Sequence, residues 1–230
     1  MGVCMTLLEG ENAAMLVDTG YGIEDVADFM RHMTDLPLTV FLTHNHHDHA
    51  MGARCFPETY MLEADMADWR MFTNDEMRRR VLTQAIGKNL PVDEKTFLAG
   101  EIPLPKVMKP GVIDLGGLTA EIIEAPGHTP GSAVVYVPER KLLLSGDDWN
   151  PCTWLFFPQA LGLREYRSNM RGIQQLPFEK VLCPHREALY DRWMFDDFFN
   201  ALTDGNLRAA EPVNICLLYT SDAADDRISV

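Results

Sequence analysis

The stretch Thr43-His44-Asn45-His46-His47-Asp48-His49 decides the fold of this 230-residue chain, because it gathers metal-binding side chains in the pattern H-x-H-x-D-H. Imidazoles two residues apart in an extended or tightly turned segment project the same way, so His44 and His46 can close on one ion. Asp48 and His49 can point to a second ion as the chain turns. Each histidine alone has an ordinary explanation, as a surface or core residue satisfied by hydrogen bonds. The cluster instead predicts two neighbouring metal sites on one short loop.

Further candidate ligands repeat a pattern in which an apolar, β-rich run is followed by a metal-binding residue. Residues 38–42 read as a buried strand ahead of the histidine run. Strand-like runs at 118–123, 142–144 and 181–182 precede His128, Asp147 and His185. Open α/β sheets place their chemistry at the carboxyl ends of strands. Five of the seven histidines therefore belong to one expected site, and only His32 and His47 are left out.

A family resemblance follows from these motifs together with Leu-Val-Asp-Thr-Gly at 16–20 and Pro-Gly-His-Thr-Pro-Gly-Ser at 126–132. The chain resembles metallo-β-lactamase-fold hydrolases over roughly residues 5 to 190, with the motifs in family order. The resemblance implies an α/β (α+β) architecture, a four-layered αβ/βα sandwich with two mixed sheets face to face and helices outside. It specifies the superfamily and leaves the substrate open.

The resemblance also implies a ligand set like that of glyoxalase II and the lactonases. The first ion would be held by His44, His46 and His128, the second by Asp48, His49 and His185, with Asp147 bridging the two. Asp18 would support the ligand loop through buried hydrogen bonds. The cofactors implied are two divalent metal ions, with zinc expected and iron or manganese suited by the same ligands.

Two metals bridged by a carboxylate and a water imply hydrolysis. Coordination lowers the pKa of water from near 16 to about 7, which supplies hydroxide for attack on a carbonyl or phosphoryl centre. Asp48 is the candidate catalytic residue, since it can hold or shuttle the proton for the leaving group. By resemblance, a bridging aspartate such as Asp147 is found in thioesterase, lactonase and nuclease branches. A small acyl thioester, lactone or ester is therefore favoured over a β-lactam.

Two other functional classes stay open. Persulfide dioxygenases share this fold and much of the motif, but they use one iron held by two histidines and an aspartate, so spacing alone does not separate them from hydrolases. A non-catalytic metal-binding protein is disfavoured, because all seven candidate ligands are present.

Composition indicates one domain, over residues 1–215, and narrows the partners to a small-molecule substrate. The net charge is −14, which disfavours nucleic acid, and the run Arg78-Arg79-Arg80 reads as a solvated helix face beside acidic residues. No run of about 18 apolar residues predicts a membrane span, and the first residues lack a signal-peptide layout. Five cysteines without a C-x-x-C pair agree with a reducing, cytoplasmic location. The oligomeric state is left open, with a dimer as one form.

Helical periodicity appears at residues 23–33, with Ile23, Val26, Ala27, Met30 and Met33 expected to face the core, and again at 163–173. The segment from about 60 to 110, helical around 65–90, reads equally as a lid or as a plain packing helix pair. A predicted substrate pocket consists of Trp149, Trp154, Phe156 and Tyr190. The alternative is that the aromatics fill the core beside the site.

The last residues, 216–230, resemble no continuation of the fold. Cys-Leu-Leu-Tyr-Thr-Ser followed by Asp-Ala-Ala-Asp-Asp resembles a translated sequencing adapter, which indicates a gene assembled from short reads, of metagenomic type. The alternative is a genuine acidic tail. Either way the segment is excluded from fold reasoning.

Overall fold

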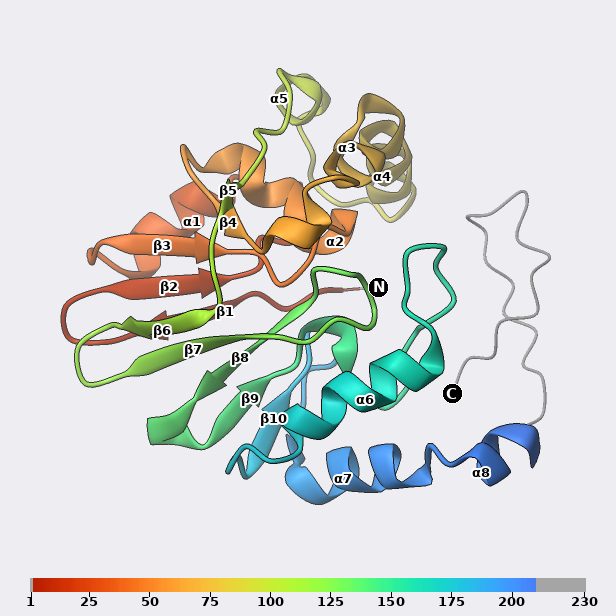
Figure 1. Cartoon of the computed structure of the whole chain (residues 1–230). Helices are drawn as coiled ribbons and strands as arrows, with labels where there is room; N and C mark the ends of the chain where they lie inside the picture. Colours follow the sequence, from red (N-terminus) through yellow and green to blue (C-terminus); the bar gives the residue numbers. More distant parts are fainter. Residues whose placement is uncertain (1, 210–230) are drawn as a thin grey trace.

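The computed structural model describes residues 2–209. Short strands, whose successive side chains point to opposite faces, form two sheets (Figure 1). The first sheet has the order β1-β2-β3-β4-β5 and comprises Thr6–Glu9, Ala14–Val17, Leu38–Phe41, Tyr60–Met61 and Lys106–Val107. The second has the order β11-β10-β9-β8-β7-β6 and comprises Leu189–Asp191, Lys180–Leu182, Leu142–Leu144, Ala133–Val137, Thr119–Glu124 and Gly111–Asp114. Both sheets mix parallel and antiparallel pairs.

Side chains on opposite faces of the same strand enter different cores. In β2, Met15 packs between the two sheets, whereas Leu16 packs outward with the helix that covers the first sheet. In β8, Val135 faces the other sheet and Val134 faces the helices behind it. Strands buried on both faces are apolar throughout, which explains the continuous apolar runs in the sequence. The four-layered αβ/βα arrangement predicted from the sequence is confirmed.

Helices form the outer layers. The first sheet is covered by α1 (Val26–Met33), and the second by α6 (Leu163–Ile173) and α7 (Arg192–Ala201), followed by α8 (Asp204–Ala209) (Figure 1). The helix at 163–173 therefore matches its predicted bounds. Met33 was expected in the core, but it is 54% exposed and lies outside the cluster in which Val26, Ala27 and Met30 pack.

The part of segment 60–110 that lies between β4 and β5 is mainly helical. It contains α3 (Trp69–Thr73), α4 (Asp75–Gly87) and α5 (Glu94–Leu98), and its side chains Trp69, Val81 and Phe97 are buried in one cluster with residues of the ligand loop region. This packing agrees with the helix-pair interpretation of the segment.

The prediction that residues 78–80 form a solvated helix face is wrong for Arg78. Its guanidinium is buried and donates hydrogen bonds to the carbonyl oxygens of Phe97, Ala99 and Gly100, in and just after α5, while Arg79 and Arg80 are exposed. The sequence pattern missed this because the acceptors lie about twenty residues further along the chain.

The remaining elements are short and follow strand ends. They are α2 (His47–Ala50) and the 3-10 turns η1 (Met51–Cys55), η2 (Glu63–Asp65), η3 (Pro138–Arg140) and η4 (Gly146–Asp148). A turn at Gly116 and Gly117 joins β6 to β7, and both glycines have positive φ. Within residues 2–209 no helix is long and apolar enough to cross a membrane. The predicted boundary at residue 215 and the adapter-like tail lie outside the described residues.

Candidate metal centre

All seven predicted metal ligands converge at one end of the two sheets. The potential ligand atoms form three overlapping groups, and within each group the atoms lie within 4.8 Å of one another. The groups are His44 with His46 and His128; His44 with His49 and Asp147; and Asp48 with His49 and His185. The first sheet supplies four of the seven through the loop after β3 and through α2, and the second supplies His128, Asp147 and His185. A backbone hydrogen bond of 3.0 Å from Ala133 N to Thr43 O joins the two sheets at this edge.

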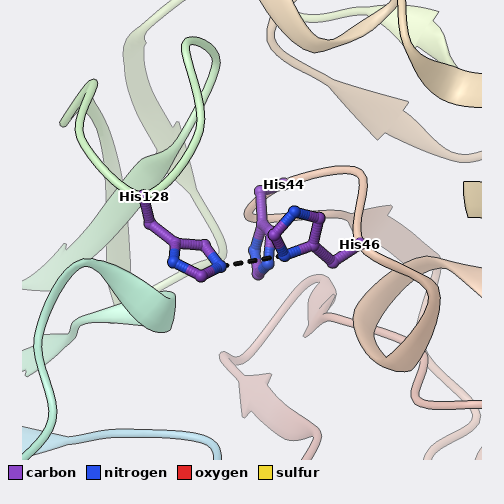
Figure 2. A group of neighbouring side chains, drawn as sticks. All are labelled: His44, His46 and His128. Carbon is purple, nitrogen blue, oxygen red and sulfur yellow. Dashed lines mark hydrogen bonds between the residues drawn. The ribbon is translucent and has the colours of Figure 1, made fainter. Parts of the chain in front are cut away.

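The first group, which we call the histidine half (His44, His46 and His128), offers only nitrogen. Figure 2 shows the three rings turned toward one another, with His128 Nε2 2.9 Å from His46 Nδ1. His128 Nδ1 lies 2.7 Å from the Trp154 carbonyl oxygen and must donate to it, so Nε2 carries the lone pair. His44 Nδ1 faces the Thr43 hydroxyl at 3.0 Å, which leaves Nε2 to face the centre. The tautomers thus aim free lone pairs inward.

Burial keeps the histidine half uncharged. Loss of hydration lowers the pKa of His44 and of His46 well below the usual value, and neighbouring imidazoles lower it further. Burial also lowers the pKa of His128, despite the attraction of Asp147. Neutral imidazole is the form that binds metal ions, so these pKa directions favour coordination.

The other four ligands, which we call the carboxylate half (Asp48, His49, Asp147 and His185), bring negative charge. His185 Nε2 lies 3.1 Å from Asp147 Oδ2 and 3.5 Å from Asp48 Oδ2. His49 Nε2 lies 3.5 Å from Asp147 Oδ1. Asp147 also reaches the histidine half, because its Oδ2 is 3.5 Å from His128 Nε2. It therefore lies between the two groups, as expected of a bridging ligand.

In the carboxylate half, the aspartates raise the pKa values of the histidines, whereas burial lowers those in the histidine half. Burial alone would lower the pKa of His49, but Asp147, Asp18 and Asp48 together raise it well above the usual value. The pKa of His185 is also raised against burial, chiefly by its hydrogen bond to Asp147. Asp147 itself has a pKa well below the usual range: its burial acts to raise the pKa, and the attraction of His49 and His185 outweighs it.

Asp18 orients the ligand loop, as the sequence predicted. Its carboxylate accepts hydrogen bonds from Thr43 N at 2.7 Å, from the Thr43 hydroxyl at 3.0 Å and from His49 Nδ1 at 2.8 Å. Asp18 has a φ of 65°, an unusual conformation for a residue other than glycine. The strained backbone is compensated by a side chain that fixes the His49 tautomer and leaves Nε2 free.

The donor set fits a metal ion because several buried polar atoms have no hydrogen-bond partner in the described chain. Two of them face the centre, His44 Nε2 and Asp147 Oδ1. His46 Nε2 and His185 Nδ1 also have no partner there, but they belong to rings whose other nitrogen faces the centre. Buried polar groups are nearly always paired, so unpartnered atoms beside converging ring nitrogens fit a bound cation. Imidazole and carboxylate donors suit zinc, iron or manganese.

Aromatic side chains border the histidine half. The ring of Phe72, from α3, lies 4.4 Å from that of His46, and the ring of Phe157 lies 4.8 Å from His46 and 5.5 Å from His128. The predicted pocket residues Trp154 and Phe156 follow in series, with Phe156 4.7 Å from Phe157 and 5.4 Å from Trp154. These side chains are half-buried, apart from Phe72, which is buried.

Trp149 and Tyr190 are corrected. Trp149 is only 1% exposed and packs against Phe195 in the core behind the second sheet. Tyr190 packs on Trp149 with ring centroids 5.5 Å apart. This packing follows the alternative interpretation, in which the aromatics fill the core beside the site. Cys183 is likewise a buried strand-end thiol, and burial raises its pKa to about 11.

Sequence reasoning missed Phe72, Phe157, Thr43 and Asp65. Phe157 stood inside the aromatic segment that the sequence singled out, and Phe72 inside the helical segment 65–90, but neither position carried a signal that it would contact an imidazole. Asp65 is a buried carboxylate that joins two ligand loops, and no local pattern marks it.

The sequence model described as the metallo-beta-lactamase superfamily matches residues 2–185. The chain belongs to the metallo-β-lactamase superfamily. Among its relatives in this superfamily, an acyl-coenzyme A thioesterase from Gallus gallus is 26% identical over 200 residues, which cover 78% of this chain and 70% of that protein. A metallo-β-lactamase from Pontibacter korlensis superposes with a TM-score of 0.61 at 17% identity, over 88% of this chain and 87% of that one. A superfamily protein from Sulfolobus tokodaii superposes with a TM-score of 0.58 at 17% identity, over 95% and 85% of the two chains.

Superfamily membership and the ligand cluster support the same chemistry. The chain is a metal-dependent hydrolase of the metallo-β-lactamase superfamily, with a cluster of histidine and aspartate side chains suited to divalent metal ions.

Proposed function

We propose that this enzyme hydrolyses a small acyl thioester, with two divalent metal ions, zinc by expectation, held by the histidine half and the carboxylate half. The observation that carries the proposal is the position of Asp147 between the two halves, within 3.5 Å of His128 Nε2 and 3.1 Å of His185 Nε2. One carboxylate that reaches both groups suits a pair of ions. Lactones and simple esters are the neighbouring substrate classes.

The choice of a thioester is supported by the relative from Gallus gallus, which is named an acyl-coenzyme A thioesterase. At 26% identity this likeness supports a substrate class rather than a particular acyl chain. By resemblance, the bridging position of Asp147 is shared by thioesterase, lactonase and nuclease branches, and the net charge of −14 disfavours a nucleic-acid substrate.

Ions bound in such a centre activate a water toward hydroxide near neutral pH and stabilise negative charge that develops on the acyl oxygen. The protein residues then orient the reactants. Asp48 is the most accessible carboxylate of the centre, with its side chain 15% exposed and Oδ2 3.5 Å from His185 Nε2. From this position it can take a proton and deliver it to the leaving thiolate.

The rings of Phe72 and Phe157 contact that of His46, and Phe156 and Trp154 continue the series of aromatic contacts. We assign the apolar part of the acyl group to this aromatic border, because burial of apolar surface against aromatic rings is favourable and non-directional. The pocket assignment therefore keeps Trp154 and Phe156 and replaces Trp149 and Tyr190 with Phe72 and Phe157.

The test begins with elemental analysis of the purified protein, followed by a panel of acyl-coenzyme A thioesters, lactones, aryl esters and a chromogenic β-lactam. About two ions per chain and the highest kcat/KM on thioesters are expected. Asp48→Asn should weaken the ion of the carboxylate half, because Asp48 is also one of its proposed ligands. Assayed at metal concentrations that keep two ions bound, it should still lose most of the turnover, because the amide keeps the shape of the side chain but cannot take a proton. Full activity of this variant would refute the role of Asp48.

Other outcomes would redirect the assignment. One iron per chain, with oxygen consumed on a persulfide substrate, would favour the dioxygenase alternative. Stoichiometric metal without turnover of any substrate class would favour a metal-binding protein. The highest kcat/KM on the β-lactam would contradict the ranking of substrates.

A further inference from the structure

Asp65 is a buried carboxylate that belongs to neither half of the metal centre. It ends η2, the turn that follows β4, and it is 1% exposed. Strands β3 and β4 run parallel, with Phe41 opposite Tyr60, so the residues that follow them emerge side by side. Asp65 therefore lies beside the loop that carries His44 and His46.

Both carboxylate oxygens of Asp65 accept hydrogen bonds from ligand loops. Oδ2 accepts from the backbone N–H of Asn45 at 3.1 Å and from the Thr129 hydroxyl at 2.7 Å. Oδ1 accepts from the backbone N–H of Gly131 at 2.6 Å. The Asp65 carbonyl oxygen accepts in turn from the Asn45 amide at 2.9 Å.

These partners are neighbours of the metal ligands in sequence. Asn45 stands between His44 and His46, and Thr129 directly follows His128. His128 comes from the second sheet, whereas the other two members of the histidine half come from the first. Asp65 thus connects the two sheets at the point where the histidine half is assembled.

The contact is close enough to need glycine at position 131. A Cβ added to Gly131 would lie 2.6 Å from the Asp65 backbone nitrogen and 2.7 Å from its carboxyl group. No side chain other than hydrogen fits there without moving Asp65, so backbone and carboxylate meet directly. Such a contact leaves little freedom in the distance between the loops.

We propose that Asp65 is a positioning residue, which sets the separation of His128 from His44 and His46 and thereby the affinity of the histidine half for its metal ion. The proposal rests on the metal-dependent function but not on the identity of the substrate. A carboxylate is required because both of its oxygens face donors. An amide at this position would direct its own N–H groups toward Gly131 N–H or Asn45 N–H, and one donor would lose its acceptor.

The test compares metal affinities in four variants. Asp65→Asn removes one acceptor, Thr129→Val removes the hydroxyl donor with little change of shape, and Thr129→Ser restores that donor. Thr73→Val is the matched control, because the Thr73 hydroxyl is equally buried and donates to the Trp69 carbonyl at 2.7 Å, away from the ligand loops. Zn(II) is titrated into each apoprotein in competition with a chromophoric chelator, and the visible spectrum of the Co(II) form reports ligand geometry.

We expect Asp65→Asn and Thr129→Val to weaken, by about 10- to 100-fold, the same ion whose binding is lost in His128→Ala, and to change the Co(II) spectrum. Thr129→Ser should bind Zn(II) as the unaltered protein does, and so should Thr73→Val. If Asp65→Asn does not fold by circular dichroism, the pair of Thr129 variants decides the question alone.

Two results would overturn the proposal. The first is an unchanged Zn(II) affinity in Thr129→Val, or in a folded Asp65→Asn. The second is an equal loss of affinity in Thr73→Val and Thr129→Val, which would mean that any lost buried hydrogen bond loosens the centre. Neither result depends on turnover, so the proposed thioesterase activity is judged separately.

Discussion

The histidine half and the carboxylate half of the metal centre differ in charge, in burial and in the groups behind them. The histidine half is fully buried and uncharged, and its rings are held by a hydroxyl and a carbonyl oxygen. The carboxylate half holds two aspartates, its His185 side chain is 17% exposed, and His49 is held by the Asp18 carboxylate. A single short loop thus supplies two environments that bind ions for different reasons.

This difference indicates a division of work. Buried neutral imidazoles hold an ion by lone pairs and geometry, with little competition from protons. The carboxylate half attracts ions by charge, but protons compete for His49 and His185, whose pKa values are raised. Access to solvent at Asp48 and His185 also makes the carboxylate half the side where a proton can be exchanged.

Loss of a ligand from each half gives the largest expected effects. His128→Ala should weaken the ion of the histidine half, and His185→Ala that of the carboxylate half, each by more than the roughly 100-fold that outer partners contribute. Isothermal titration of apoprotein with Zn(II) measures both affinities. If either variant lost both ions equally, the two halves would be one cooperative site.

Asp18→Asn should have the next largest effect. The amide cannot accept from both Thr43 N–H and His49 Nδ1–H as the carboxylate does, so the His49 ring loses its fixed tautomer. We expect about a 10- to 100-fold weaker ion in the carboxylate half and a smaller change in the histidine half. Thr43→Val serves for comparison, because it removes the hydroxyl behind His44 and keeps the backbone donor. A larger loss in the histidine half upon Asp18→Asn would contradict the assignment.

Lowering the pH should release the ion of the carboxylate half before the ion of the histidine half. Ligand nitrogens bind ions only when deprotonated, and the raised pKa values of His49 and His185 mean that protons displace the ion of the carboxylate half first as pH falls. The lowered pKa values of His44 and His46 preserve the histidine half to lower pH. As pH falls from 8, affinity in the carboxylate half should fall before that in the histidine half, by up to about tenfold per pH unit for each proton that competes with the ion. Metal content after dialysis at each pH measures this, and parallel loss of both ions would break the comparison.

Phe157→Leu should have the smallest effect, because it removes ring contacts of the histidine half and keeps apolar volume. Aromatic pairs contribute about 0.5–1.5 kcal/mol beyond buried area, so we expect kcat/KM on an acyl thioester to fall about 2- to 10-fold with metal content unchanged. Phe198→Leu is the matched control, since Phe198 is also half-buried and packs edge to face on Phe199, behind the second sheet. Equal losses in both variants would remove Phe157 from the substrate side.

The strand-end positions of the ligands could be predicted because the signal is local. A buried strand followed by histidine or aspartate recurs before His44, His128, Asp147 and His185, and each ligand lies where the pattern indicated. The helix at 163–173 was also predicted from the spacing of its apolar residues. The spacing of apolar residues does not predict the burial of a side chain that depends on partners distant in the sequence. Met33 has the spacing of a core residue but is exposed. Arg78 has the sequence neighbours of a surface residue, but its buried guanidinium donates to three carbonyl oxygens.

The sequence by itself determined the seven candidate ligands, because these depend on residue type and on spacing within a few residues. The superfamily and the two-sheet architecture followed from the resemblance that those motifs carry. The tertiary structure decided which groups stand behind the ligands. Asp65 contacts Thr129 and Gly131 across more than sixty residues, Phe72 and Phe157 meet at His46 from separate segments, and Trp149 turns into the core. The physical reason is that hydrogen-bond pairing and close packing are satisfied between segments brought together only by folding, and a linear pattern carries no record of which distant donor will reach a buried acceptor.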